Sequence, residues 1–231
     1  MSYIAVIGGS SGIGAKTIDI LLHKGFQVWH LTRNPSSLPR EGLKEEYFDV
    51  SSAQAFPQAP GPLSGLLYCP GTITLKPFHN LSLQDFENDW RINFLGAVRT
   101  LQAFYPALKA QGDASVVLFS SVAAAKGMPF HASIAAVKAA LEGLGRSLAA
   151  EWAPAVRVNV VAPSLTDTPL ASRWLNTPEK RQNAANRHPL KRIGSAEDAA
   201  ALVAFLLSSE AAWITGQVIH VDGGLSTLTT S

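Results

Sequence analysis

A glycine-rich segment between a predicted strand and a predicted helix is the feature that most restricts the fold of this chain. Residues 3–7 form a short apolar run rich in β-branched side chains, and it stops at Gly-Gly-Ser-Ser-Gly-Ile-Gly, residues 8–14. Apolar residues then recur at helical spacing until Gly25, and residues 26–31 supply a second strand. The sequence therefore predicts that the chain opens with a βαβ unit.

The same alternation continues through the rest of the 231 residues. Further strands are predicted at residues 46–50, 65–69, 115–120, 156–161 and 217–221, and helices at residues 83–109, 133–152 and 196–207. Parallel neighbours need crossover connections, which place helices on both faces of a sheet. We therefore predict a Rossmann-like, doubly wound α/β fold with seven mostly parallel strands.

The chain is predicted to form one domain over residues 1–231, because no shift in composition marks a boundary. Residues 51–64 contain several prolines, and since proline interrupts helix interiors, a crossover helix there should be short or absent. Residues 167–192 hold three more prolines among polar residues and follow the carboxyl end of a strand, where open α/β sheets bind ligands. We expect this segment to be a substrate lid.

Composition excludes several classes of protein. Hydrophobic residues make up 47% of the chain and charged residues 16%, which is typical of a folded globule. A net charge of +2 is too balanced for nucleic-acid binding, and the longest apolar run, residues 199–207, is too short to cross a bilayer. There is no basic leader, and the one cysteine, Cys69, cannot form an internal disulfide, so the chain is expected to be cytoplasmic. We expect no nucleic-acid partner, no membrane partner and no metal.

The glycine-rich segment is predicted to bind a pyrophosphate. Glycine allows positive φ and close approach of a phosphate, while free amides and the helix dipole favour an anion. An ordinary tight turn is the alternative, but the position between a strand and a helix favours a nucleotide. The predicted contacts are Gly8, Ser10, Ser11, Gly12, Ile13 and Gly14.

The end of the second strand indicates which dinucleotide is bound. About 20 residues after the last glycine, a free ribose hydroxyl usually meets Asp or Glu, but this chain has Thr32-Arg33-Asn34. Arg33 offers a fork of donors that suits a phosphate monoester, although a solvated surface arginine is the alternative. NADP(H) is therefore predicted in preference to NAD(H).

These features together resemble the short-chain dehydrogenase/reductase family, from about residue 3 to residue 225. Asp49-Val50 resembles the pair that contacts adenine in relatives, and Asn93 is similar to the helix asparagine of the family. Residues 68–71 stand where relatives carry Asn-Asn-Ala-Gly, and Ser164 stands where glycine is usual. Residues 189–194, 214–217 and 221–224 are close to the C-terminal segments of the family. The resemblance adds as cofactor contacts Asp49, Val50, Cys69, Pro70, Gly71, Lys138, Pro163 and Thr166.

One residue departs from the catalytic motif of the family. Relatives place Ser, then Tyr thirteen residues later, then Lys four residues beyond; Ser121 and Lys138 fit, but Ile134 occupies the tyrosine position. In the family, tyrosine exchanges the proton, lysine lowers the pKa of the phenol and binds ribose, serine bonds the reacting oxygen, and asparagine holds a relay water. A positioned general acid contributes roughly 10² to 10⁴ in rate, so ordinary carbonyl reduction should be severely slowed unless another group donates.

His131 is one possible substitute, because it lies on the same helical face as Lys138 if the helix begins early enough. A loop histidine bonded to the backbone beside Pro129 is an equally good interpretation. Tyr68, at the end of the fourth strand, is a second candidate, although packing beneath the nicotinamide is favoured. Ser133 could also supply a hydroxyl, at a poorer helical angle.

Two further features allow a functional and a plainer interpretation. The predicted lid is basic, which would suit an anionic substrate, but a solvated helix face explains it better. Its basic residues are Arg173, Lys180, Arg181, Arg187, His188, Lys191 and Arg192. Cys69 could be a nucleophile, yet a lone thiol at a strand end is more often a small packed residue.

The sequence thus predicts an NADP(H)-dependent oxidoreductase that acts on a small carbonyl, alcohol, imine or activated double bond with a non-standard proton donor. The catalytic set is Ser121, Lys138, Asn93 and His131. A catalytically silent NADP(H)-binding sensor or structural protein is the alternative. The resemblance also implies a homodimer or homotetramer through the helices at residues 83–109 and 133–152.

Overall fold

The computed structural model describes residues 2–229 and contains a sheet of seven parallel strands in the order β3-β2-β1-β4-β5-β6-β9. The strands are β1 (Tyr3–Ile7), β2 (Gln27–Thr32), β3 (Leu43–Tyr47), β4 (Leu63–Tyr68), β5 (Ala114–Phe119), β6 (Val156–Pro163) and β9 (Val218–Val221). The chain runs outward from β1 to β3 and then returns to β4 on the other side. This reversal creates a crevice between the carboxyl ends of β1 and β4, and the sheet confirms the predicted doubly wound fold.

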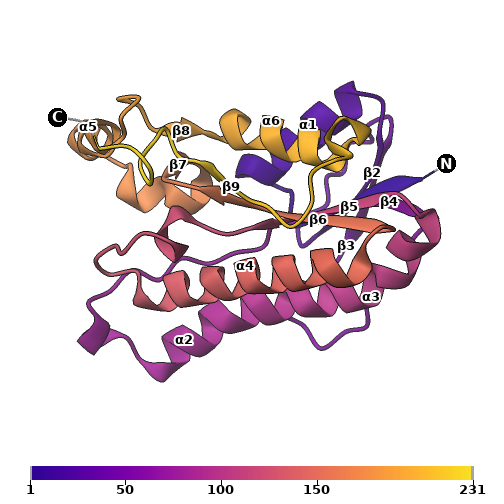
Figure 1. Ribbon diagram of the computed structural model, residues 1–231, viewed down its shortest axis with the longest axis horizontal. Coiled ribbons are helices and arrows are strands. Elements are labelled where there is room, and N and C mark those ends of the chain that lie inside the picture. Colours follow the sequence, from indigo (N-terminus) through magenta and orange to yellow (C-terminus); the bar gives the residue numbers. More distant parts are fainter. Residues whose placement is uncertain (1, 230–231) are drawn as a thin grey trace.

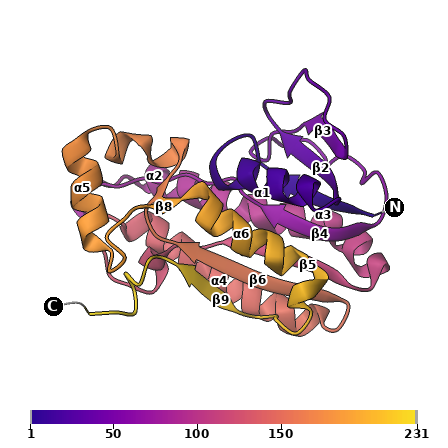
Figure 2. The same ribbon diagram turned by 90° about the horizontal axis from the view of Figure 1, so that it is seen from above.

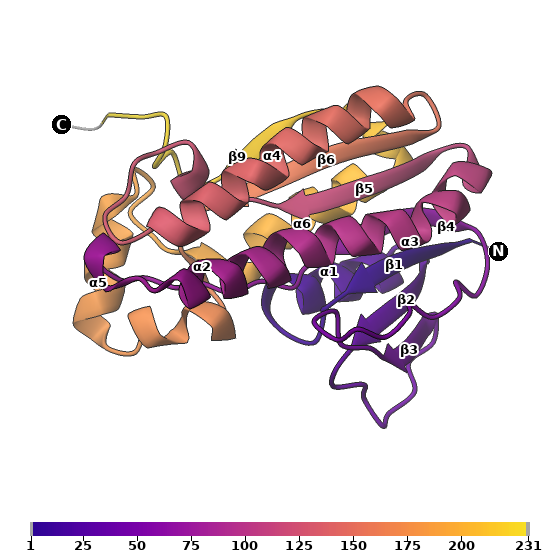
Figure 3. The same ribbon diagram turned by 90° about the horizontal axis from the view of Figure 1, so that it is seen from below.

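Helices cover both faces of the sheet. The helices of the chain are α1 (Gly12–His23), α2 (Leu83–Asp89), a π-helical turn (Trp90–Leu95), α3 (Gly96–Gln111), α4 (Ala132–Trp152), α5 (Pro178–Arg187) and α6 (Ala196–Leu207), of which α5 lies away from the sheet. Figure 1 shows α1 and α6 above the sheet and α3 and α4 below it; Figures 2 and 3 view these two faces. Every helix within residues 2–229 is too short or too polar to span a membrane.

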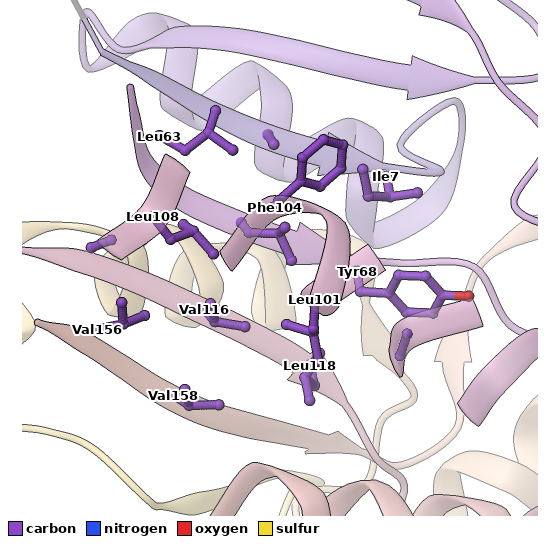
Figure 4. Packing of buried hydrophobic residues seen from close by; sticks show 14 of the residues in the cluster. Ile7, Leu63, Tyr68, Leu101, Phe104, Leu108, Val116, Leu118, Val156 and Val158 are labelled. Atoms are coloured by element: carbon purple, nitrogen blue, oxygen red, sulfur yellow. The ribbon is translucent and has the colours of Figure 1, made fainter. Parts of the chain in front are cut away.

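Strand residues alternate between two apolar layers. In β1, Ala5 and Ile7 pack toward α3 and α4, whereas Ile4 and Val6 pack toward α1 and α6. Figure 4 shows the first layer, in which side chains of α3 such as Phe104 meet the central strands. Because both faces are covered, the central strands are mostly apolar, which is why they could be recognised in the sequence, whereas the edge strand β3 reads Leu-Lys-Glu-Glu-Tyr.

The segment at residues 51–64 has no crossover helix, as predicted. Phe56 takes over the covering role of a helix there. Its ring lies 4.4 Å from the ring of Phe48 and 5.4 Å from that of Phe104, between centroids. One inserted aromatic ring therefore covers this part of the sheet edge.

Two predicted elements differ from the structure. The third strand was predicted at residues 46–50 but lies at Leu43–Tyr47, because pairing with β2 sets its register: Val28 lies opposite Leu43 and Thr32 opposite Tyr47. The predicted helix at residues 83–109 is instead α2, a π-helical turn and α3 in succession. A π turn has no signature in apolar periodicity.

Residues 167–192 lie beyond the carboxyl ends of the strands, where α5 stands apart from the helices that cover the sheet (Figure 2). A small second sheet closes the base of this segment, since β7 (Thr166–Asp167) pairs with β8 (Gly194–Ser195). Between them lie a 3₁₀ segment, Pro169–Trp174, and α5. The role of this segment as a lid stays a prediction.

Candidate active site

A cavity of about 950 Å³ opens at the carboxyl ends of the strands. Strand-end residues that line it are Ile7, Thr32, Cys69, Phe119 and Pro163. The cavity also brings together the predicted catalytic set and the predicted cofactor contacts. These residues are Gly8, Ser10, Ser11, Gly12, Ile13, Gly14, Arg33, Asp49, Val50, Cys69, Pro70, Gly71, Asn93, Ser121, His131, Lys138, Pro163 and Thr166. The sequence motifs therefore converge on one place, although the role of each residue stays a prediction.

The glycine turn leaves its backbone free toward the cavity. Gly8 has φ of +73°, and a Cβ atom there would lie 2.9 Å from Pro70 Cγ. A Cβ atom at Gly14 would lie 2.8 Å from Gly9 Cα. Helix α1 starts without a side-chain cap, because Ser11 accepts no bond from the first turn. The first amides of α1 can therefore be satisfied by an anion.

His30 supports the glycine turn from behind, and sequence reasoning missed it. Its Nε2 accepts a 2.9 Å hydrogen bond from the Gly9 amide, and its Nδ1 lies 2.7 Å from Glu45 Oε1. The ring is 2% exposed, and burial lowers the pKa of His30 although Glu45 opposes the shift. A neutral ring that donates to Glu45 and accepts from Gly9 satisfies both contacts. A polar residue within an apolar strand was the available signal.

The end of the cavity beside β2 carries an exposed cation. Arg33 follows β2 and lines the cavity, and within residues 2–229 the only acidic lining residue is Asp49. The hydroxyl and amide of Ser51 hold the pKa of Asp49 below its usual range, with a smaller contribution from Arg33. An exposed guanidinium and the absence of a strand-end carboxylate fit a ribose phosphate.

The opposite wall is formed by the end of β5 and the first turns of α4. Ser121 starts a short 3₁₀ turn, where its Oγ accepts a 3.2 Å bond from the Ala123 amide and leaves its own proton to donate. Lys138 is 9% exposed and its Nζ donates to the Phe119 carbonyl at 2.9 Å. Burial lowers the pKa of Lys138 to about 8. Ile134 is 3% exposed and adds an aliphatic surface to this wall.

The π-helical turn places Asn93 at the floor of the cavity. Its Nδ2 donates to Thr72 Oγ1 and to the Asp89 carbonyl, both at 2.9 Å. Its buried Oδ1 has no hydrogen-bond partner in the part of the chain that the structure describes. A Cβ atom built at Gly71 would lie 3.2 Å from this Oδ1 and 3.9 Å from Lys138 Nζ, so the two polar atoms face the same narrow space. An acceptor in this position fits a bound ribose hydroxyl or a proton-relay group.

Of the predicted substitute donors, only His131 lines the cavity. It is the half-buried N-cap of α4, and its Nδ1 lies 2.7 Å from the Pro129 carbonyl oxygen, which is the geometry of a backbone-bonded loop histidine. Its catalytic role stays a prediction.

Tyr68 and Ser133 point away from the cavity. The Tyr68 hydroxyl donates to the Ile92 carbonyl, the ring is 2% exposed, and burial raises the pKa of the phenol (Figure 4). Ser133 donates to Asp89 Oδ2 at 2.7 Å, behind the wall. The suggestion that either one donates to a substrate is therefore wrong, because each proton is already committed to a buried acceptor.

Cys69 is a packed residue. Its Sγ lies 3.0 Å from the position of a Cβ atom at Gly14, and burial raises the pKa of the thiol to about 12, with Lys138 opposing the shift. The thiol is therefore protonated at neutral pH, which favours the packing interpretation.

The predicted lid contributes a polar face and a serine–histidine pair. Lys180, Asn183 and Arg187 lie on the face of α5 that lines the cavity. Ser164 Oγ lies 2.9 Å from His188 Nε2, and His188 Nδ1 lies 2.8 Å from the Ala184 carbonyl. This contact fixes the end of α5 to the turn that follows β6. Ser164 and His188 are 24 residues apart, so the sequence alone does not reveal that they meet.

Other basic residues of this segment are used for structure. Arg181 pairs with Asp167, and Arg192 pairs with Asp198. Arg173 donates to the Ile73 carbonyl at 2.7 Å. These three arginines have partners within the protein, whereas Lys180 and Arg187 line the cavity. Whether the basic residues meet a substrate stays a prediction.

Comparison with known proteins places the chain in a family. The family described as enoyl-(acyl carrier protein) reductase matches residues 8–226. A tropinone reductase homolog of Arabidopsis thaliana is 35% identical over 240 residues, which cover 96% of this chain and 91% of that protein.

Solved structures agree with this result. Aldohexose dehydrogenase of Thermoplasma acidophilum has a TM-score of 0.88 and 27% identity, covering 100% of this chain and 97% of that one. A short-chain type dehydrogenase/reductase of Mycobacterium ulcerans has a TM-score of 0.87 and 28% identity, covering 97% and 90%. From the matched sequence, the parallel sheet and the converging motifs, the chain belongs to the short-chain dehydrogenase/reductase family of oxidoreductases.

Proposed function

We propose that this protein is an NADP(H)-dependent oxidoreductase that acts on a small carbonyl, alcohol or imine and uses a proton donor other than tyrosine. The observation that carries the proposal is the single cavity that joins the glycine turn, the Arg33 guanidinium and the Ser121–Lys138 wall. The name of the Arabidopsis relative, a tropinone reductase homolog, supports reduction of a carbonyl compound.

The residues present fit a phosphorylated dinucleotide. The amides at the start of α1 would hold the pyrophosphate, and Arg33 would bind the ribose phosphate. Asp49 and Val50 would contact the base at one end, while Lys138 and the unpartnered Asn93 Oδ1 would meet the second ribose at the other. When bound, the nicotinamide ring supplies or accepts a hydride.

The wall of the cavity determines what the chain itself can contribute. The Ser121 hydroxyl can donate to a substrate oxygen, and the Lys138 ammonium adds positive charge beside it. Ile134 has no exchangeable proton and only excludes water from this surface. Substrates such as iminium ions, which accept a hydride without acid catalysis at oxygen, would suit this wall best.

Cofactor titration tests the proposal. We expect NADPH, followed by its own fluorescence, to bind at least tenfold more tightly than NADH, and Arg33→Ala to remove this preference because a charged hydrogen bond contributes about 1.5–3 kcal/mol. Arg40→Ala is the matched control, because Arg40 is also exposed but pairs with Asp19. If the pure protein binds neither nucleotide, the proposed function is wrong.

Ile134 also favours a second candidate, a catalytically silent protein that binds NADP(H). The variant Ile134→Tyr distinguishes the two functions, since an otherwise intact site would gain about 10² to 10⁴ in rate on generic ketones. If the protein is catalytically silent, Ile134→Tyr gains no activity, and the wild type turns over no member of a panel of carbonyl and imine compounds.

A further inference from the structure

A buried carboxylate lies behind the catalytic wall. Asp89, the last residue of α2, is 0% exposed. Its Oδ1 accepts hydrogen bonds from Thr72 Oγ1 at 2.6 Å and from Thr74 Oγ1 at 3.2 Å, and its Oδ2 accepts one from Ser133 Oγ at 2.7 Å. Three hydroxyl groups can stabilise an ionised carboxylate, but none of them neutralises its charge.

The carboxylate is joined to both sides of the active site. Thr72, which donates to Asp89, also accepts from Asn93 Nδ2, so one chain of bonds runs from the carboxylate to the cavity floor. Ser133, another of the three donors, directly precedes Ile134 on α4. Asp89 therefore holds α4 and the loop after β4 together where Lys138 enters the cavity.

The charge of Asp89 acts on Lys138. Burial lowers the pKa of Lys138, and the charge of Asp89 is the largest influence that opposes this. Cys69 faces Lys138 from the end of β4, but its thiol is uncharged at neutral pH. Glu142, one turn later on α4, is held by Ser120 Oγ at 2.7 Å and lies beside Arg146. Asp89 is therefore the fixed negative charge that favours the ammonium form of Lys138.

The wall contains few proton donors besides Lys138. Ile134 has none, Ser133 and Tyr68 are committed to buried acceptors, and one ring nitrogen of His131 contacts the Pro129 carbonyl. Among the described residues 2–229, the one hydrogen bond that Lys138 Nζ donates goes to the Phe119 carbonyl. An ammonium group has three protons, so two remain for the cavity.

We propose that the Lys138 ammonium is the proton donor to the substrate and that Asp89 is a positioning residue that keeps Lys138 charged. This rests on the proposed function. In reduction, the new C–H bond of the substrate forms with a hydride released from the C–H bond of the reduced nicotinamide, the π electron pair of the C=O or C=N bond moves to the heteroatom, and that atom takes a proton from Nζ. Lys138 is left as a neutral amine and regains a proton from water. Oxidation follows the reverse path.

The charge of Lys138 can be measured without turnover. In the full-length protein labelled with ¹³Cε-lysine, Lys138→Arg assigns the resonance of Lys138, and its pH titration gives the pKa. We expect Asp89→Asn to lower this pKa by about 1 to 3 units, because an opposite charge nearby shifts a pKa by that amount. Thr74→Val, which removes one hydroxyl and keeps the carboxylate, is the control. It should change the pKa of Lys138 by less than about 0.5, which is roughly half of the smallest change expected for Asp89→Asn.

If Asp89→Asn does not fold, the double variant Asp89→Leu/Ser133→Ala removes the carboxylate together with one of its three hydroxyl donors, so that fewer buried groups are left without a partner. The same fall in the pKa of Lys138 is expected. An unchanged pKa in whichever variant folds would overturn the role of Asp89.

Turnover tests the proton-donor half. The reduction rate of the wild type should fall as Lys138 loses its proton, and Asp89→Asn should move this limb to lower pH by the shift that NMR measures. Lys138→Arg keeps a charge but releases no proton, so the rate should fall about 10² to 10⁴-fold with NADPH still bound. An unmoved limb, or a Lys138→Arg enzyme as active as the wild type, overturns Lys138 as the donor. A wild type that binds no nucleotide overturns the proposed function instead, while the NMR result on Asp89 still stands.

Discussion

Replacing His30 by leucine should destabilise both the fold and the cofactor site. The change removes the acceptor of the buried Gly9 amide and puts an apolar side chain of similar volume in its place. A buried donor left without a partner costs about 1–3 kcal/mol. For a chain of this size, each kcal/mol lowers Tm by roughly 2–4 °C. We also expect NADPH to bind about tenfold more weakly, since about 1.4 kcal/mol of turn ordering would have to come from binding.

The pH dependence has a definite sign. The folded-state pKa of His30 is lowered, so between this value and the unfolded pKa near 6.5 the unfolded chain binds more protons than the folded one. This contribution to stability is therefore present above about pH 6.5 and is lost as pH falls toward the folded pKa. The difference between the wild-type and His30→Leu stabilities should shrink as the pH is lowered through this window.

Urea unfolding at a fixed protein concentration from pH 5 to pH 8, with NADPH titration, measures both effects. His30→Gln should restore most of the loss, because its amide can accept from Gly9 and donate to Glu45. His23→Leu, at an exposed histidine of α1, should stay within about 0.5 kcal/mol of the wild type. Equal stability and affinity for the wild type and His30→Leu would refute the role given to His30.

Three other changes have expected outcomes. Gly8→Ala forces a side chain onto φ of +73° and against Pro70, so NADPH affinity should fall at least about tenfold, with the strain of about 1–2 kcal/mol visible in urea unfolding. The double variant Lys180→Ala/Arg187→Ala removes the cations of the α5 face, so KM should rise for carboxylate-bearing substrates and stay constant for neutral ones; a uniform rise would exclude charge recognition. Leu108→Ala opens the layer under α3, where the side chain is 0% exposed, and should cost about 2–5 kcal/mol of unfolding free energy without changing the cofactor preference.

The sequence predicted the parts of the fold that depend on local pattern. Apolar runs such as residues 114–119 and the glycine turn follow from burial on both faces and from backbone freedom, so they can be read without knowing any partner. The position of β3 was three residues off, because its register is set by β2 and its Leu-Lys-Glu-Glu-Tyr sequence carries little periodicity.

The site was predicted where a motif has fixed spacing and missed where contacts are long-range. Ser121 and Lys138 were found through their spacing in the chain. Asp89 and its donor Ser133 are 44 residues apart, and His30 meets Gly9 across 21 residues, so only the folded chain brings them together. His30 is a polar residue between apolar neighbours in a buried strand, whereas Asp89 ends the largely polar helix α2, so only His30 leaves a signal in the sequence.

The pairing of β7 with β8 brings the two ends of the segment between them to one place. Thr166 lies opposite Gly194 and Asp167 opposite Ser195, so both attachment points are fixed side by side on the body of the protein. A graft that replaces the residues between these anchors changes the walls around the substrate without altering any strand of the seven-stranded sheet. Transplanting this stretch from a relative is therefore a route to new selectivity on an unaltered nucleotide-binding body.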